Sequence, residues 1–235
     1  MRMNAQLGKQ DLMRFIGNMP QQFIQQYPNH PLSIHGSVNG NIQRMEFTGL
    51  DIQLPTALHL KADGFAANIT DMNQLRGQIA LKAEMQNLNF AKAFIPVKNL
   101  RLPPMTLSGN FMADRGSYNV AAVLREGKGM VQANLAAPDL NNIASYKVDI
   151  KASQLNLYHF LPDDSLYNLT ADLTADLTMR NGHATGTITG QNALFDGSIG
   201  IDALLSSKRV EATIMPQLSK AGLFGMKLTN DPLTI

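Results

Sequence analysis

The segment from Asn168 to Gly182, with the sequence NLTADLTADLTMRNG, alternates apolar and polar residues without a break. From Leu169 to Met179 every second residue is apolar, and Thr or Asp occupies each position between. Because successive side chains of a β-strand point to opposite faces of the sheet, this pattern predicts a long strand with one apolar and one solvated face. The Asn181-Gly182 pair that follows is typical of a tight hairpin turn.

The same alternation recurs along most of the chain. We predict strands over residues 32–40, 42–54, 57–62, 78–85, 118–125, 130–137, 146–152, 168–180, 184–190, 193–205 and 210–214. Turn residues separate most of them, and Asp196-Gly197 falls inside a strand segment, where it indicates a bulge or bend. Strands joined by short connections usually pair with their neighbours in sequence. The pattern therefore predicts a meandering antiparallel sheet.

Residues 10–27 form the one clear helical stretch. Its apolar residues keep helical spacing and make one stripe, which consists of Leu12, Phe15, Ile16, Met19, Phe23 and Tyr27. Gly17-Asn18 followed by Pro20 should divide the stretch into two short helices. We expect residues 1–31 to be a helical cap or linker whose stripe packs on the sheet. A membrane-surface helix is the alternative, but such helices carry a Lys- and Arg-rich polar face, which is absent.

The sheet region, residues 32–235, contains a weak internal repeat with approximate units 32–106, 107–172 and 173–235. The segment 88–96, LNFAKAFIP, resembles the segment 155–162, LNLYHFLP. Each unit is predicted to hold several meandering strands and a short helical turn that ends in proline, so the sheet would grow by repetition. We expect the chain to be a fragment of a longer protein.

Composition excludes several classes of function. Charged residues make up only 16% of the chain, the net charge is +2, and the basic residues do not cluster, which argues against a nucleic-acid partner. The absence of cysteine excludes disulfides and thiolate metal sites. No run reaches the ~20 apolar residues that a membrane helix needs.

No group of residues has the spacing that catalysis requires. The histidines, which we expect on solvated faces or in loops, lack metal-ligand spacing; they are His30, His35, His59, His159 and His183. Asp163-Asp164 is best explained as a helix N-cap or solvated turn. Residues 186–190, GTITG, form a strand rather than a phosphate-binding loop, since no Lys-Ser/Thr follows them. We expect no enzymatic activity, no metal and no cofactor.

A sheet with one apolar face cannot leave that face in water. It can fold over on itself, close as a barrel, or curl into a gutter that holds an apolar ligand. Aromatic residues are only 6% of the chain and Trp is absent, while the 13 methionines suit an adaptable apolar lining. An ordinary β core stays open as an alternative. The candidate lining residues are Ile79, Leu81, Met85, Val131, Leu135, Val148, Ile150, Leu169, Leu173, Leu177, Met179, Ile188, Phe195, Ile199 and Ile201.

Three phrases carry a resemblance to a known family. They are LPPMTLSGNF at 102–111, ATGTITGQNALF at 184–195 and FDGSIGID at 195–202. Together with the alternating strands and Asn-Gly turns, they resemble the AsmA/TamB-like group over about residues 30–235. The resemblance implies a long sheet curled into an open groove with an apolar interior. With the helical stretch, we therefore predict an all-β fold with a short N-terminal helical segment and a long meandering antiparallel sheet.

The resemblance also implies a place and a function. It indicates a periplasmic envelope protein of a diderm bacterium, anchored to the inner membrane through a segment not in this chain. Its partners would be phospholipid acyl chains, both membranes through parts absent here, and an outer-membrane assembly protein. We therefore expect a non-catalytic groove for lipid transport between membranes or for outer-membrane protein assembly. The alternative is a structural β-solenoid or scaffold module with a dry core and no ligand.

Overall fold

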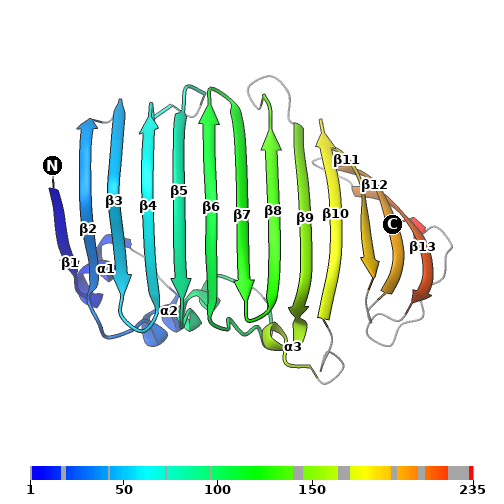
Figure 1. Cartoon of the computed structure of the whole chain (residues 1–235), viewed down its shortest axis with the longest axis horizontal. Helices are drawn as coiled ribbons and strands as arrows, with labels where there is room; N and C mark the ends of the chain where they lie inside the picture. Colours follow the sequence, from blue (N-terminus) through cyan, green and yellow to red (C-terminus); the bar gives the residue numbers. More distant parts are fainter. Residues whose placement is uncertain are drawn as a thin grey trace.

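A computed structural model of the chain describes residues 2–16, 20–41, 43–71, 73–95, 97–139, 145–163, 170–191, 195–205, 210–221 and 233–234. Within these residues one sheet contains fourteen strands, and their spatial order is the order of the chain. Every neighbouring pair is antiparallel. The first ten strands stand side by side, and β11 to β13 turn away from their plane (Figure 1). The predicted open, curled meander is confirmed.

Most strands have nine to twelve residues, which gives the sheet an even width. The strands are β1 Arg2–Leu7, β2 Leu32–Asn41, β3 Arg44–Leu54, β4 Leu58–Ala67, β5 Arg76–Met85, β6 Met105–Asp114, β7 Ser117–Glu126, β8 Gly129–Ala137, β9 Ser145–Asn156, β10 Thr170–Arg180, β11 His183–Gln191, β12 Phe195–Leu205, β13 Val210–Ala221 and β14 Leu233–Thr234. The hairpin at Asn181-Gly182 is confirmed, since Arg180 pairs with His183 and both turn residues have positive φ.

Four short helices interrupt the described strands. They are α1 Lys9–Ile16, α2 Gln21–Gln26, the 3₁₀ helix η1 Asn89–Phe94, and α3 Leu157–Phe160. Pro20 is the N-cap of α2, so the predicted division of the N-terminal helical stretch is confirmed. The segments η1 and α3 are the two helical turns that the internal repeat predicted. All four helices lie at one end of the strands, the lower end in Figure 1.

Residues 1–31, which we expected to be a helical cap or linker, contain a strand ahead of the two helices. Residues Arg2–Leu7 form β1, the edge strand, which pairs with β2 from Arg2↔Ser37 to Leu7↔Leu32. The physical reason is the period-two alternation of Met3, Ala5 and Leu7 with polar residues, which extends the apolar face by one strand.

The pairing register places apolar residues of successive strands directly opposite one another. Residues directly opposite in an antiparallel pair share a face, so long rows of apolar side chains cross the sheet. One row consists of Phe47, Gly64, Ile79, Phe111, Val120, Leu135, Val148, Leu177, Gly186 and Ile201. The neighbouring row consists of Leu50, Ala62, Leu81, Gly109, Ala122, Ala133, Ile150, Ala175, Ile188 and Ile199. We call this side of the sheet the apolar face and the other side the wet face.

Two β-bulges, one between β3 and β4 and one between β9 and β10, are stabilised in the same way. The register of β3 with β4 shifts between Phe47 and Leu50, where Gly49 has a φ of 58°, and the Asp63 carboxylate accepts the Gly49 N–H at 2.6 Å. At the β9–β10 shift, Gln154 has a φ of 50° and its N–H is accepted by Asp172 at 2.9 Å. An aspartate on the adjacent strand thus satisfies the bulged N–H in both cases. The irregularity predicted at Asp196-Gly197 is confirmed in the β12–β13 register.

The helical segment packs on the sheet, as its stripe predicted. Phe23 and Tyr27 are buried against Leu54 and Ala57 at the β3–β4 turn, and Phe90 of η1 packs onto the same cluster. The Phe23 ring lies 5.4 Å from Tyr27 and 5.5 Å from Phe90 between centroids, which is a favourable aromatic spacing. Burial raises the pKa of the Tyr27 phenol above its ordinary value. We call this cluster the aromatic cap.

Candidate functional site

The apolar face brings the predicted lining residues together. By register, thirteen of the fifteen share this one face, on strands from β5 to β12; these are Ile79, Leu81, Met85, Val131, Leu135, Val148, Ile150, Leu173, Leu177, Met179, Ile188, Ile199 and Ile201. Leu169 lies outside the described residues, and Phe195 lies in β12 with its side chain outside them. The period-two pattern therefore identified the face correctly.

Small residues lie along the middle of the face over β6, β7 and β8. Gly109, Ala122 and Ala133 lie in register in one row. The flanking rows on these strands carry large side chains, which are Phe111, Val120 and Leu135 on one side and Leu107, Leu124 and Val131 on the other. A row of small residues thus lies between two rows of large ones, and the side chains of the three rows are aliphatic with a single aromatic ring.

Charge is almost absent from this face. By register and strand alternation, its described residues from β1 to β13 include no Lys, Arg, His or Asp, and the one carboxylate is Glu126 at the end of β7. Ion pairs occur on the wet face instead, for example Arg76 with Asp114 at 3.0 Å and Lys147 with Asp149 at 3.6 Å. A continuous apolar surface with a single carboxylate at its edge favours aliphatic contacts.

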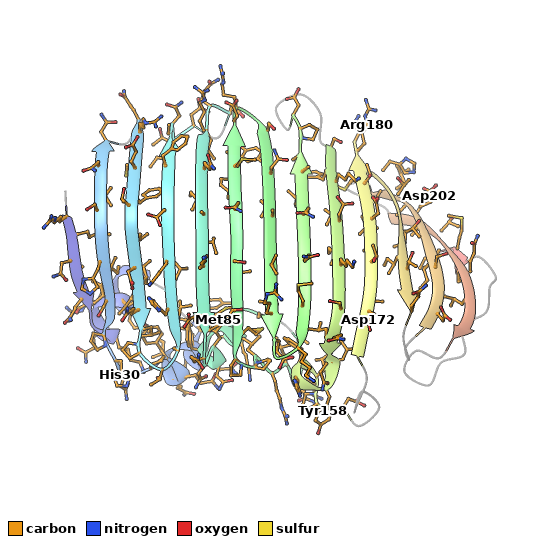
Figure 2. The ribbon with its side chains drawn as sticks, viewed as in Figure 1. His30, Met85, Tyr158, Asp172, Arg180 and Asp202 are labelled. Atoms are coloured by element: carbon orange, nitrogen blue, oxygen red, sulfur yellow. The ribbon has the colours of Figure 1, made fainter. Side chains whose placement is uncertain are left out.

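Among the described residues, no second layer covers the middle of this face. The strands make extensive contacts only with their neighbours in the sheet, and the aromatic cap lies at the strand ends. Figure 2 shows side chains crowded around Met85 and Tyr158 at that end, with Arg180 at the opposite end. From a strand spacing of about 4.8 Å and a rise of about 3.3 Å per residue, the face measures on the order of 1,500 Å². Exposed apolar surfaces beyond a few hundred Å² mark binding sites.

A second apolar cluster lies at the α3 region. Its partly buried members are Leu157, Tyr158 and Leu161, together with one residue from each of four successive strands, which are Leu173, Ile188, Ile199 and Leu218. The Asn156 side chain caps this turn by accepting the Tyr158 N–H at 3.1 Å. The two repeated helical turns therefore close the same end of the face at different strands.

Three histidines occupy solvated strand positions, as expected. His35 and His59 lie on the wet face, and His183 pairs with Asp202 at 2.7 Å. His59 lies 3.1 Å from both Asp51 oxygens. Partial burial raises the pKa of the Asp51 carboxyl, but hydrogen bonds from His59 and Gln53 and nearby positive charge outweigh it, so that pKa lies below its ordinary value. His30 lies in the exposed connection before β2.

His159 differs from that expectation, because it lies in a helix and pairs with a buried acid. Glu126 is the one buried charged residue of the described chain, with 8% of its surface exposed. His159 Nδ1 lies 2.8 Å from its Oε1. The sequence did not predict this pair because 33 residues separate the partners. The available signal was Glu126 itself, a charged residue at a position where the alternation of β7 calls for an apolar one. Asp164 lies outside the described residues, so the N-cap hypothesis for Asp163-Asp164 stays a prediction.

Hollows also lie on the wet face. One of about 570 Å³ is lined by polar side chains, which include Lys61, Asp63, Lys82, Asn110 and Gln132, and by the apolar residues Ala80, Ala121 and Val123. Charged side chains therefore border this hollow, whereas the middle of the apolar face has none. Among the described residues, no three His, Asp or Glu side chains are grouped so as to hold a metal ion.

Fold and face together define an open, single-layer antiparallel β protein with one uncovered apolar face. A scan of protein-family models and searches of curated proteins and solved structures find no match to the chain. Within the described residues, none of the helices has the length and hydropathy needed to cross a membrane.

Proposed function

We propose that the apolar face holds the acyl chains of phospholipids, without catalysis, in an envelope protein similar to the AsmA/TamB-like group. The observation that carries this proposal is the apolar face itself, which crosses the whole sheet, carries a single carboxylate at the end of β7, and has no layer of the described residues over its middle. On this proposal the chain works in the periplasm, in lipid transport between membranes or in outer-membrane protein assembly.

Aliphatic contact supplies the binding energy in this scheme. Each buried methylene contributes about 0.8 kcal/mol, so an acyl chain along the rows gains enough to offset the cost of association. The rows run across many strands with similar aliphatic residues, and a bound chain therefore meets similar surroundings along the sheet. Such a surface suits sliding of a lipid better than its retention at one point.

Two valines of β7 provide a matched test. Val120 lies on the apolar face between Phe111 and Leu135, whereas Val123 lies on the wet face between Ser108 and Gln132. Both are half-buried. We expect the full chain, purified from cells, to carry phospholipid that mass spectrometry detects, and Val120→Asp to remove it because a carboxylate then lies among the acyl chains. The matched control, Val123→Asp, should keep the lipid.

The same pair of variants separates the proposal from a scaffold. Thermal melts should show both variants folded, since neither valine lies under a second layer. A protein that carries no lipid and unfolds in Val120→Asp but not in Val123→Asp would contradict the proposal. That result would favour the structural module with a dry core, formed by self-association over this face.

A further inference from the structure

A cavity of about 580 Å³ lies where the two repeated helical turns meet the end of the apolar face. Its lining comes from η1, the connection before β6, the end of β7 and α3, and consists of Asn89, Lys92, Arg101, Leu102, Pro103, Glu126 and His159. The backbone N–H of Arg101 donates to the Phe160 carbonyl at 2.7 Å, which ties the connection to α3. The cavity is therefore a junction between successive repeat units.

The repeat places basic side chains at equivalent positions on two sides of this cavity. Lys92 of η1 and His159 of α3 occupy the same place in the matching segments LNFAKAFIP and LNLYHFLP. Arg101 adds a guanidinium from the connection before β6. The repeated helical turn thus places a basic side chain, Lys92 or His159, in the lining of the same cavity.

The lining carries an excess of positive charge. Its one acid, Glu126, is buried and lies 2.8 Å from His159, so its carboxylate holds that ring in place. No carboxylate of the described residues forms an ion pair with Lys92 or Arg101. A guanidinium and an ammonium around one open space are the usual ligands for a phosphate group, since both donate charge-assisted hydrogen bonds.

The cavity and the apolar face share one residue, Glu126. Glu126 follows Val120 and Leu124 on the apolar side of β7, and Leu102 and Pro103 add apolar lining. A ligand whose charged end lies among the basic groups can therefore place an aliphatic chain along Leu124 and Leu107, which face each other across β6 and β7.

We propose that this cavity seats the phosphate of a phospholipid headgroup whose acyl chain lies on the apolar face. The inference rests on the proposed function and adds to it a headgroup class and an entry point. We favour a phosphate carried by a lipid over a free phosphate ion because the basic groups adjoin the aliphatic surface. Lys92 and Arg101 are the binding residues, and Glu126 positions His159.

The test compares three probes by calorimetric titration of the full chain below their micelle concentrations. They are oleoyl lysophosphatidic acid, monooleoylglycerol with the same chain and no phosphate, and glycerol 3-phosphate with no chain. We expect the lysophosphatidic acid to bind about tenfold more tightly than monooleoylglycerol, the size of one or two charge-assisted hydrogen bonds. The double variant Lys92→Gln/Arg101→Gln should abolish this difference and leave monooleoylglycerol binding unchanged.

The matched control is Lys61→Gln/Lys82→Gln on the wet face, which should bind all three probes as the wild type does. Equal binding of the two lipids by the wild type overturns the headgroup site and leaves the proposed function standing. Binding of glycerol 3-phosphate as tight as that of lysophosphatidic acid makes the cavity a site for soluble phosphate and overturns the lipid assignment. Failure of both lipids to bind overturns the proposed function, and the inference with it.

Discussion

The aromatic cap and the middle of the apolar face share one surface but differ in what lies on them. Under the cap, Leu54 is 2% exposed and Ala57 is 1% exposed. Over β8, Leu135 is 36% exposed, and none of the described helices or strands lies over it. The same alternation of apolar and polar residues therefore produces a small packed core at the strand ends and a more exposed surface between them. Side-chain burial is thus concentrated in the first region.

The largest expected effect comes from placing the same charge in both regions. Leu54→Asp buries a carboxylate without a partner and should destabilise the protein by more than about 4 kcal/mol, which unfolds most domains. Leu135→Asp leaves its carboxylate in contact with water and should keep the fold. Chemical denaturation monitored by circular dichroism measures both. Equal loss of stability in the two variants would show that the middle of the face is also a packed core.

A smaller contrast lies between the two helical covers of the face. Phe23 is buried among aromatic rings, so Phe23→Ala should cost about 3 kcal/mol. Leu161 of the α3 region is only partly buried, and Leu161→Ala should cost about 1 kcal/mol. Melting temperatures of the two variants rank the covers. A larger loss at Leu161 would place the main anchor of the face at α3 instead.

The bulge between β3 and β4 should contribute less than the aromatic cap and about as much as the α3 cover. Asp63→Ala removes the acceptor of the Gly49 N–H, and water can replace it at this exposed site, so we expect a loss of about 1 kcal/mol. Asp63→Asn keeps an acceptor oxygen and is the control that should recover most of the stability. Amide hydrogen exchange at Gly49 gives a direct reading, because exchange should accelerate in the alanine variant alone.

The wet face should be the most tolerant region. Thr174→Ser, Asp176→Asn and Thr187→Gln each change an exposed or solvated side chain and should shift stability by no more than about 0.5 kcal/mol. Denaturant midpoints measured for the three variants check this. Losses of several kcal/mol at two of these positions would mean that the wet face is covered in the working protein.

The alternation is local, which explains why so much of the fold could be predicted. Leu173 and Thr174 differ in environment simply because neighbouring strand residues point to opposite faces, and no distant partner is needed to know it. The strand order followed because short connections join each strand to the next. Strand β1 carries the same signal in Met3, Ala5 and Leu7, but its short length and the adjacent helix concealed it.

The cavity between the helical turns could not be predicted in the same way. It depends on the register of β6, β7 and β9, which brings Arg101, Glu126 and His159 to one place. Register over several strands is a property of the assembled sheet. The repeat pointed to the helical turns, and only their position in space showed that Lys92 and His159 share a cavity.

The strand order sets a rule for how such a sheet can change its length. The segment η1 follows β5 and α3 follows β9, and this even interval is why both turns reach the same end. Adding or removing one hairpin lengthens or shortens the sheet by about 10 Å and keeps every helical turn at that end. A single added strand would send all later turns to the opposite end. The hairpin is therefore the smallest increment by which this architecture can be matched to the distance between two surfaces.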